Sequence, residues 1–132
     1  MIPPCRKSGA ATKLLTVKLP SAPSFVTALA KSQAAQMDDP MPTSVECVLT
    51  TRQVAVQSTM AAHVVSNSPV YLVVMHGHFI DRSARIPPGQ PFPQGNTVLF
   101  TIDTKTQQIL DFGICNQSVH LASLGHVYPI TW

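Results

Sequence analysis

The fold is decided by Pro69-Val-Tyr-Leu-Val-Val-Met-His-Gly-His-Phe-Ile80, a long run rich in apolar and β-branched residues. A proline-rich connection leads from it to Thr97-Val-Leu-Phe-Thr-Ile102, and the turn Asp103-Thr-Lys-Thr106 then leads to Ile109-Leu-Asp-Phe-Gly-Ile114. Extended segments that follow one another in this way predict an antiparallel β-meander. Because the first segment is apolar on both faces, we expect it to be central in its sheet.

The last two segments are expected to pair as a hairpin whose register follows from the period of two. Directly opposed residues share a face, so Phe100 should lie opposite Leu110 or Phe112. Leu110, Phe112 and Ile114 would then face the helix together, and Asp111 would point to solvent on the other face. Asp103 is expected to cap the turn through its side chain rather than to form a catalytic pair with Asp111.

The residues before the meander predict a helix, a strand and a short second helix. Ser21-Ala22-Pro23 supplies a cap and a first-turn proline, and a stripe then runs to Met37: Val26, Leu29, Ala30, Gln33 and Met37. Thr43–Thr50 alternates like a half-buried strand, and Thr51–Met60 is interpreted as a short helix, although its valines also suit a continued strand. After the meander, a helical turn is expected around Ser118–Leu124.

Composition limits the chain to one domain of α+β class, with an N-terminal helix packed on a small antiparallel sheet. The chain has 132 residues, of which 45% are hydrophobic and 11% are charged, enough for one core. We interpret residues 1–20 as a flexible basic lead and residues 21–132 as the domain. The longest apolar run, Val70–Met75, is far shorter than the roughly 20 residues of a membrane helix. No transmembrane segment is therefore expected.

The charge and cysteine patterns exclude several classes of function. The net charge of +3 comes mostly from scattered lysines and arginines in residues 1–20, which is a poor footprint for nucleic acid. The cysteines Cys5, Cys47 and Cys115 form no C-x-x-C pair, so a zinc knuckle or dithiol motif is not expected. Cys47 and Cys115 could pair if their strands are neighbours. The N-terminus does not match a secretion signal, because Leu14–Val17 is too short an apolar core.

The hairpin also carries a family resemblance. Ile102-Asp103-Thr-Lys-Thr106 followed by Ile109-Leu-Asp111 resembles the last hairpin of PepSY-type modules from bacterial extracytoplasmic proteins, with Gln107 where those modules usually have glycine. Motifs such as Asp39-Pro40-x-Pro42-Thr43, Gly77-His78-Phe79 and Pro87-Pro88-Gly89 are similar to small actinobacterial-type extracytoplasmic proteins. The resemblance covers roughly residues 25 to 125 and implies a binding or regulatory module outside the cytoplasm.

His76 and His78 are the metal-ligand candidates. Two residues apart on a strand, they would share one face, as in a zinc site built on a sheet. A third ligand is needed, and no spacing selects one among His63, His120, His126 and Asp81. We therefore expect no stoichiometric metal and keep a small metal- or ligand-binding protein as an alternative function.

The best binding candidate is the proline-rich loop Asp81–Asn96, with Arg82, Arg85 and Phe92 as contact residues. Arg85-Ile-Pro-Pro88-Gly-Gln-Pro91 matches a polyproline-ligand pattern, although a stiff interstrand loop explains the same residues. No G-x-S-x-G elbow or phosphate-binding glycine loop is present, and no cofactor is expected. The sequence thus favours a non-catalytic module that binds an unknown protein or peptide. An enzyme with a pocket between helix and sheet is the remaining alternative, and the oligomeric state stays open.

Overall fold

A computed structural model describes residues 21–60 and 64–132, which form a single α+β domain. The predicted basic lead, residues 1–20, lies outside the described residues, as does His63. The elements in chain order are α1 (Ser24–Gln36), β1 (Ser44–Thr51), α2 (Arg52–Thr59), β2 (Pro69–Ile80), β3 (Gln94–Asp103), β4 (Ile109–Cys115) and β5 (Val127–Pro129). The predicted fold class is confirmed.

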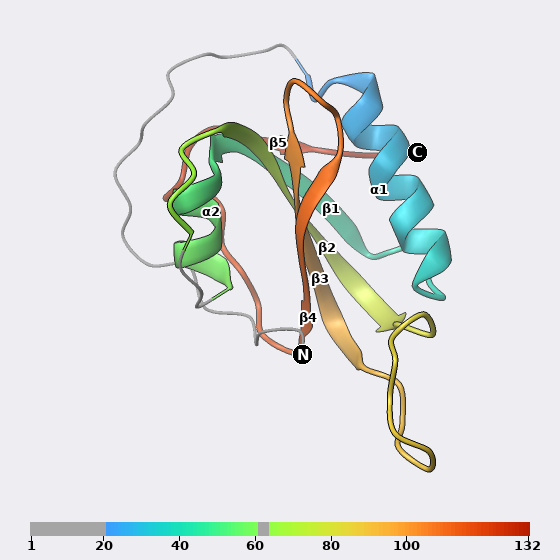
Figure 1. The fold of residues 1–132 in the computed structure, drawn as a ribbon. Helices are drawn as coiled ribbons and strands as arrows, with labels where there is room; N and C mark the ends of the chain where they lie inside the picture. The colour runs from blue at the N-terminus through green and yellow to red at the C-terminus, as the bar shows by residue number, and fades with distance from the viewer. Residues whose placement is uncertain (1–20, 61–63) are drawn as a thin grey trace.

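The five strands form one antiparallel sheet in the order β4-β3-β2-β1-β5 (Figure 1). β2, β3 and β4 are the predicted meander, and β2 is central, as its two apolar faces indicated. The sequence did not predict β5, whose residues pair with Glu46–Val48 of β1. The helical turn expected nearby is reduced to a turn in which Leu124 N donates to Leu121 O at 2.9 Å.

The sheet has a separate hydrophobic cluster on each face. α1 covers one face, where Val26, Ala30 and Ala34 pack on side chains from the strands that include Val73 and Phe100. α2 and the segment before β5 cover the other face. The cluster there is centred on Leu72 and also contains Val48, Ala55, Val74, Leu99 and Leu121. Burial on both faces explains why the β2 residues from Val70 to Met75 show no polar alternation.

α1 begins differently from the prediction and ends where it was expected, at the C-cap Met37. Its N-cap is Pro23, with no capping hydrogen bond from a side chain, so the expected serine cap is wrong. The expected apolar stripe contained Gln33, but the buried residue at this point of the helix is Ala34. The small alanine side chain lets the helix lie close to the sheet. At the C-terminus, Asp38 has φ 68° and Asp39 N donates to Ala34 O at 3.0 Å, as in a Schellman motif.

α2 confirms the helical interpretation of the segment after β1. The Thr51 side chain accepts a hydrogen bond from Val54 N at 3.3 Å, which satisfies one of the free N–H groups of the first turn. The helix then buries Ala55, Val56 and Thr59 against the sheet. None of the helices in residues 21–60 and 64–132 is long and apolar enough to cross a membrane.

The β3–β4 hairpin confirms part of the predicted register. Phe100 lies opposite Phe112, as expected, but Ile102 lies opposite Ile109 instead of keeping the alternation. The register shift leaves Leu110 as an extra residue of β4, so it is 37% exposed and Ile109 packs against the α1-side cluster in its place. The expectation that Leu110 faces the helix is therefore wrong.

The connection between these two strands is held by Asp103. Its Oδ1 accepts hydrogen bonds from Lys105 N at 2.8 Å and Thr106 N at 3.4 Å, which confirms the predicted cap. Gln107 has φ 60°, a conformation that glycine adopts at much lower cost. Glycine would therefore suit this turn better than the glutamine that occupies it.

Cys47 is a free, fully buried thiol on β1, so it does not pair with Cys115. Burial raises its pKa to about 12, which keeps the thiol protonated and unreactive. We expect iodoacetamide at pH 8 to leave Cys47 unmodified in the folded protein and to alkylate it after unfolding in guanidinium chloride. Peptide mapping by mass spectrometry checks this, and alkylation of Cys47 in the folded protein would contradict its burial.

Candidate functional site

The predicted loop is a projecting finger, a name used here for residues 81–93 between β2 and β3 (Figure 1). Its base is closed where Asp81 N donates to Pro93 O at 2.8 Å. The buried Asp81 carboxylate also accepts hydrogen bonds from Ser83 N at 3.1 Å and Ser83 Oγ at 2.7 Å. β3 begins at Gln94, earlier than the sequence indicated, so the loop is shorter than predicted.

The tip of the finger is a tight turn. Gln90 N donates to Pro87 O at 3.2 Å, and Gly89 between them has φ 83°. Proline and glycine at the two central positions with positive φ at glycine are typical of a type II turn. The turn folds the R-x-x-P-x-x-P pattern back on itself, so the finger does not present the continuous polyproline helix that this pattern would offer.

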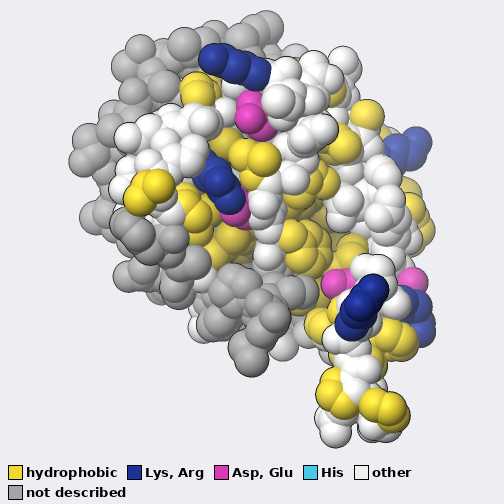
Figure 2. All heavy atoms as spheres, viewed as in Figure 1, with side chains coloured by type: hydrophobic (Ala, Val, Ile, Leu, Met, Phe, Trp, Pro, Cys, Tyr) yellow, Lys and Arg dark blue, Asp and Glu magenta, His cyan; other side chains and the backbone are white. Residues whose placement is uncertain are grey.

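The finger is built without core packing. Ile86 and Phe92 are half-buried, yet neither belongs to the two hydrophobic clusters or to the partly buried side chains packed against them. Arg82 and Arg85 are exposed, and so is most of the tip. In Figure 2 the finger extends away from the body of the molecule, with hydrophobic side chains at its end. The three predicted contact residues thus lie on one projecting element.

Arg82 ties the base of the finger to the end of α1. Its Nε donates to Asp38 Oδ2 at 2.6 Å, although both side chains are substantially exposed, at 58% and 36%. The backbone reinforces this junction, because Ile80 N donates to Met37 O at 2.9 Å. The finger therefore has a defined direction relative to the helix. Arg85 differs from Arg82, since no described residue forms an ion pair with it.

A cleft of about 590 Å³ lies beside the finger, between α1 and β4. Ile109 and Phe112 of β4 give it apolar lining, and Gln33 and Gln36 line it from α1. Asp81, Arg82 and Ser83 of the finger base complete it. This is the pocket between helix and sheet that the sequence raised as an enzyme alternative. The Asp81 carboxylate in it is already hydrogen-bonded twice to Ser83.

The two histidine candidates do not join a metal-ligand cluster. The strand register shifts between His76 and Phe79, which interrupts the alternation that would put both histidines on one face. The His76 ring Nδ1 contacts Ser44 Oγ at 3.1 Å, and the His78 backbone N–H donates to Asp39 Oδ2 at 2.9 Å. In the part of the chain that the structure describes, no group of three or more ligand side chains is placed to hold a metal.

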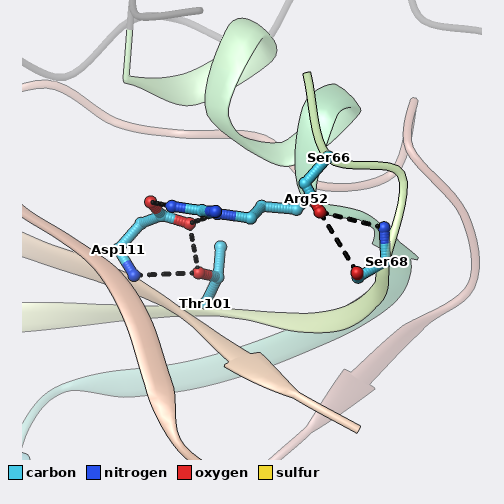
Figure 3. A network of polar contacts seen from close by, with 5 residues as sticks. All are labelled: Arg52, Ser66, Ser68, Thr101 and Asp111. Atoms are coloured by element: carbon cyan, nitrogen blue, oxygen red, sulfur yellow. Dashed lines mark hydrogen bonds and ion pairs between the residues drawn. The ribbon is translucent and has the colours of Figure 1, made fainter. Parts of the chain in front are cut away.

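Sequence reasoning missed the main ion pair. Arg52, the first residue of α2, makes a two-pronged contact with Asp111 of β4, with Nε and Nη2 donating at 2.9 and 2.8 Å (Figure 3). Thr101 Oγ1 on β3 donates to the same carboxylate at 2.6 Å. The Asp111 side chain is only 13% exposed, so the prediction that it is solvated is wrong.

The electrostatics of Asp111 follow from these contacts. Burial alone would raise its pKa, but the hydrogen bonds from Arg52 and Thr101 outweigh burial and the pKa lies below its usual range. All three groups are satisfied by one another, and together they join α2 to the β3–β4 hairpin. The arrangement therefore serves the fold. Only Arg52, with 28% of its side chain exposed, has surface left for another molecule.

Comparisons of the chain with family models, with curated proteins and with solved structures found no match. The similarity to PepSY-type modules therefore stays an expectation from the sequence.

Proposed function

We propose that this chain is a non-catalytic binding module that contacts a partner protein through the finger. The observation that carries the proposal is that the finger is ordered at both base and tip while its side chains serve neither hydrophobic cluster. A segment that only closed the sheet end would bury its apolar residues in one of those clusters. Loops held on a rigid scaffold in this way are frequent binding elements.

Preorganisation favours binding by this segment. Pro87, Pro88, Pro91 and Pro93 restrict the backbone, and the turn at Gly89 is closed by a hydrogen bond. The finger would therefore lose little conformational entropy when a partner fixes it in one shape. The exposed prolines and half-buried Phe92 offer apolar contact area at the same place.

The charge of the finger indicates the kind of surface that it would meet. Arg85 is exposed and has no ion-pair partner among the described residues, while Arg82 keeps guanidinium N–H groups beyond the one that contacts Asp38. An acidic surface around an apolar depression complements these features. Planar guanidinium groups bind carboxylates through two parallel hydrogen bonds, which adds directional specificity.

Replacing residues 86–93 with a Gly/Ser linker tests the proposal. Because these residues contribute to neither cluster, we expect the free energy of unfolding to change by less than about 1 kcal/mol, while binding to the partner is lost. Denaturant titration measures the first quantity, and affinity capture followed by titration with the purified partner measures the second.

A charge reversal provides the finer version of this experiment. Arg85→Glu should weaken partner binding at least tenfold, whereas Lys31→Glu on the exposed surface of α1 makes the same charge change away from the finger and should not. Equal effects of the two substitutions would contradict a specific role of the finger. A large loss of stability in the linker variant would assign the finger to packing instead.

A further inference from the structure

Among the described residues, no strand pairs with the outer edge of β4, where the sheet order ends. Asp111 N donates to Thr101 Oγ1 on β3 at 3.1 Å, so this residue directs its backbone inwards. Alternation along an antiparallel strand then directs the N–H and C=O groups of Phe112 and Ile114 outwards. An extended chain is the ligand that satisfies such groups.

The cleft described above lies next to this edge. Phe112 and Ile109 give it an apolar lining, while Gln33 and Gln36 face it from α1. Carboxamides offer both hydrogen-bond donors and acceptors, so they suit the backbone of a peptide as well as its side chains. The volume of about 590 Å³ has room for several side chains. The edge and the cleft together match a strand with apolar residues at alternate positions.

The other face of the same strand is polar. Asp111 points there with Arg52, whose side chain is 28% exposed (Figure 3). A strand added to β4 would place every second side chain on this face, with one of them beside the guanidinium. Acidic residues fit that position, since their charge complements the exposed part of Arg52. The two faces of β4 therefore favour apolar residues at alternate positions on one face and an acidic residue beside Arg52 on the other.

We propose that β4 accepts an extended segment of the partner protein by strand addition, with apolar side chains in the cleft and an acidic side chain beside Arg52. The inference rests on the proposed function, because Arg82 and Ser83 belong to both the finger base and the cleft, so a partner on the finger also borders β4. A second copy fits less well, since a pair of β4 strands would carry the irregularity at Leu110 on both sides, whereas a partner segment adds a regular strand.

The experiment uses a phage-displayed library of linear dodecapeptides selected on the full chain. Enriched peptides should share apolar residues at alternate positions with an acidic residue between two of them. A synthetic peptide of the enriched sequence should slow amide hydrogen exchange of Phe112 and Ile114 at least tenfold, while the inward-facing amide of Gly113 changes little. Leu110→Lys should lower the affinity for this peptide at least tenfold, because lysine on an edge strand opposes strand addition.

Val65→Lys is the matched control, since Val65 is 85% exposed and lies outside β4. Enrichment of no alternating pattern, or peptides that leave both β4 amides unchanged, would overturn the proposal. Exchange that slows with protein concentration in the absence of peptide would assign the edge to a second copy and overturn it too. The variant with residues 86–93 replaced should still bind the peptide, so failure of strand addition and failure of the finger proposal are distinguishable.

Discussion

Phe100→Ala should lower the free energy of unfolding by about 3–5 kcal/mol. Phe100 is fully buried on β3, in the cluster between the sheet and α1, and lies opposite Val73 on one side and Phe112 on the other. Removing its ring leaves a cavity in the core. Because β3 is held between β2 and β4, the surrounding side chains can relax into this cavity only partially. Titration with urea or guanidinium chloride measures the loss of unfolding free energy, and the dependence of this free energy on denaturant concentration (the m-value) should be unchanged.

Leu110→Ala on the neighbouring strand is the control, because Leu110 is 37% exposed. It should cost less than about 1 kcal/mol, in keeping with surface positions. Phe112→Ala should fall between the two variants, since its ring is half-buried and lines the cleft. Equal losses for Phe100→Ala and Leu110→Ala would contradict the arrangement of the core.

Asp111→Asn should cost about 1.5–3 kcal/mol at neutral pH, the range for hydrogen bonds to charged groups. The change removes the carboxylate that receives Arg52 and Thr101, and it leaves a guanidinium that is 28% exposed without its counter-charge. Asp38→Asn is the matched control, because the Arg82–Asp38 pair is far more exposed and should contribute less than about 1 kcal/mol.

The same carboxylate predicts a pH dependence. The folded-state pKa of Asp111 lies below its ordinary value of 3.8. Its contribution to stability is therefore complete above pH 3.8 and is lost as the pH falls through the folded-state pKa. The stability difference between the natural chain and Asp111→Asn should accordingly be constant at neutral pH and shrink below pH 3.8. A difference that grew on acidification would contradict the ion pair.

Periodicity predicted the meander because β2 and β3 are both buried on their two faces, and the apolar runs that fit such burial are a local property of their sequences. It failed at Leu110, the extra residue of β4 at which the register shifts, because no local pattern marks the shift. The partner of Asp111 is 59 positions away on α2, so the ion pair depends on the assembled fold. β5 was missed because its three residues form a strand only through pairing with β1.

The finger was predictable as a loop, since its prolines exclude a place in the sheet interior. The length of the loop was not predictable. β3 begins already at Gln94, because Gly95 has no side chain and its backbone can lie close to the backbone of Cys115. The type II turn at its tip follows from Pro88-Gly89. The cleft depends on how α1 crosses the sheet, which places Gln33 on its wall although the helical stripe assigned this residue to the core.

Photocrosslinking from position 85 tests most directly the claim that the finger is the contact surface. A benzophenone amino acid is placed at Arg85 and, in a separate variant, at Lys31, and both proteins are irradiated in the cells that produce the chain. We expect a discrete crosslinked product from position 85 that is absent from position 31. Excess of the unmodified chain should compete for this product, and excess of the linker variant should not. No product from position 85, or the same products from both positions, would contradict this claim.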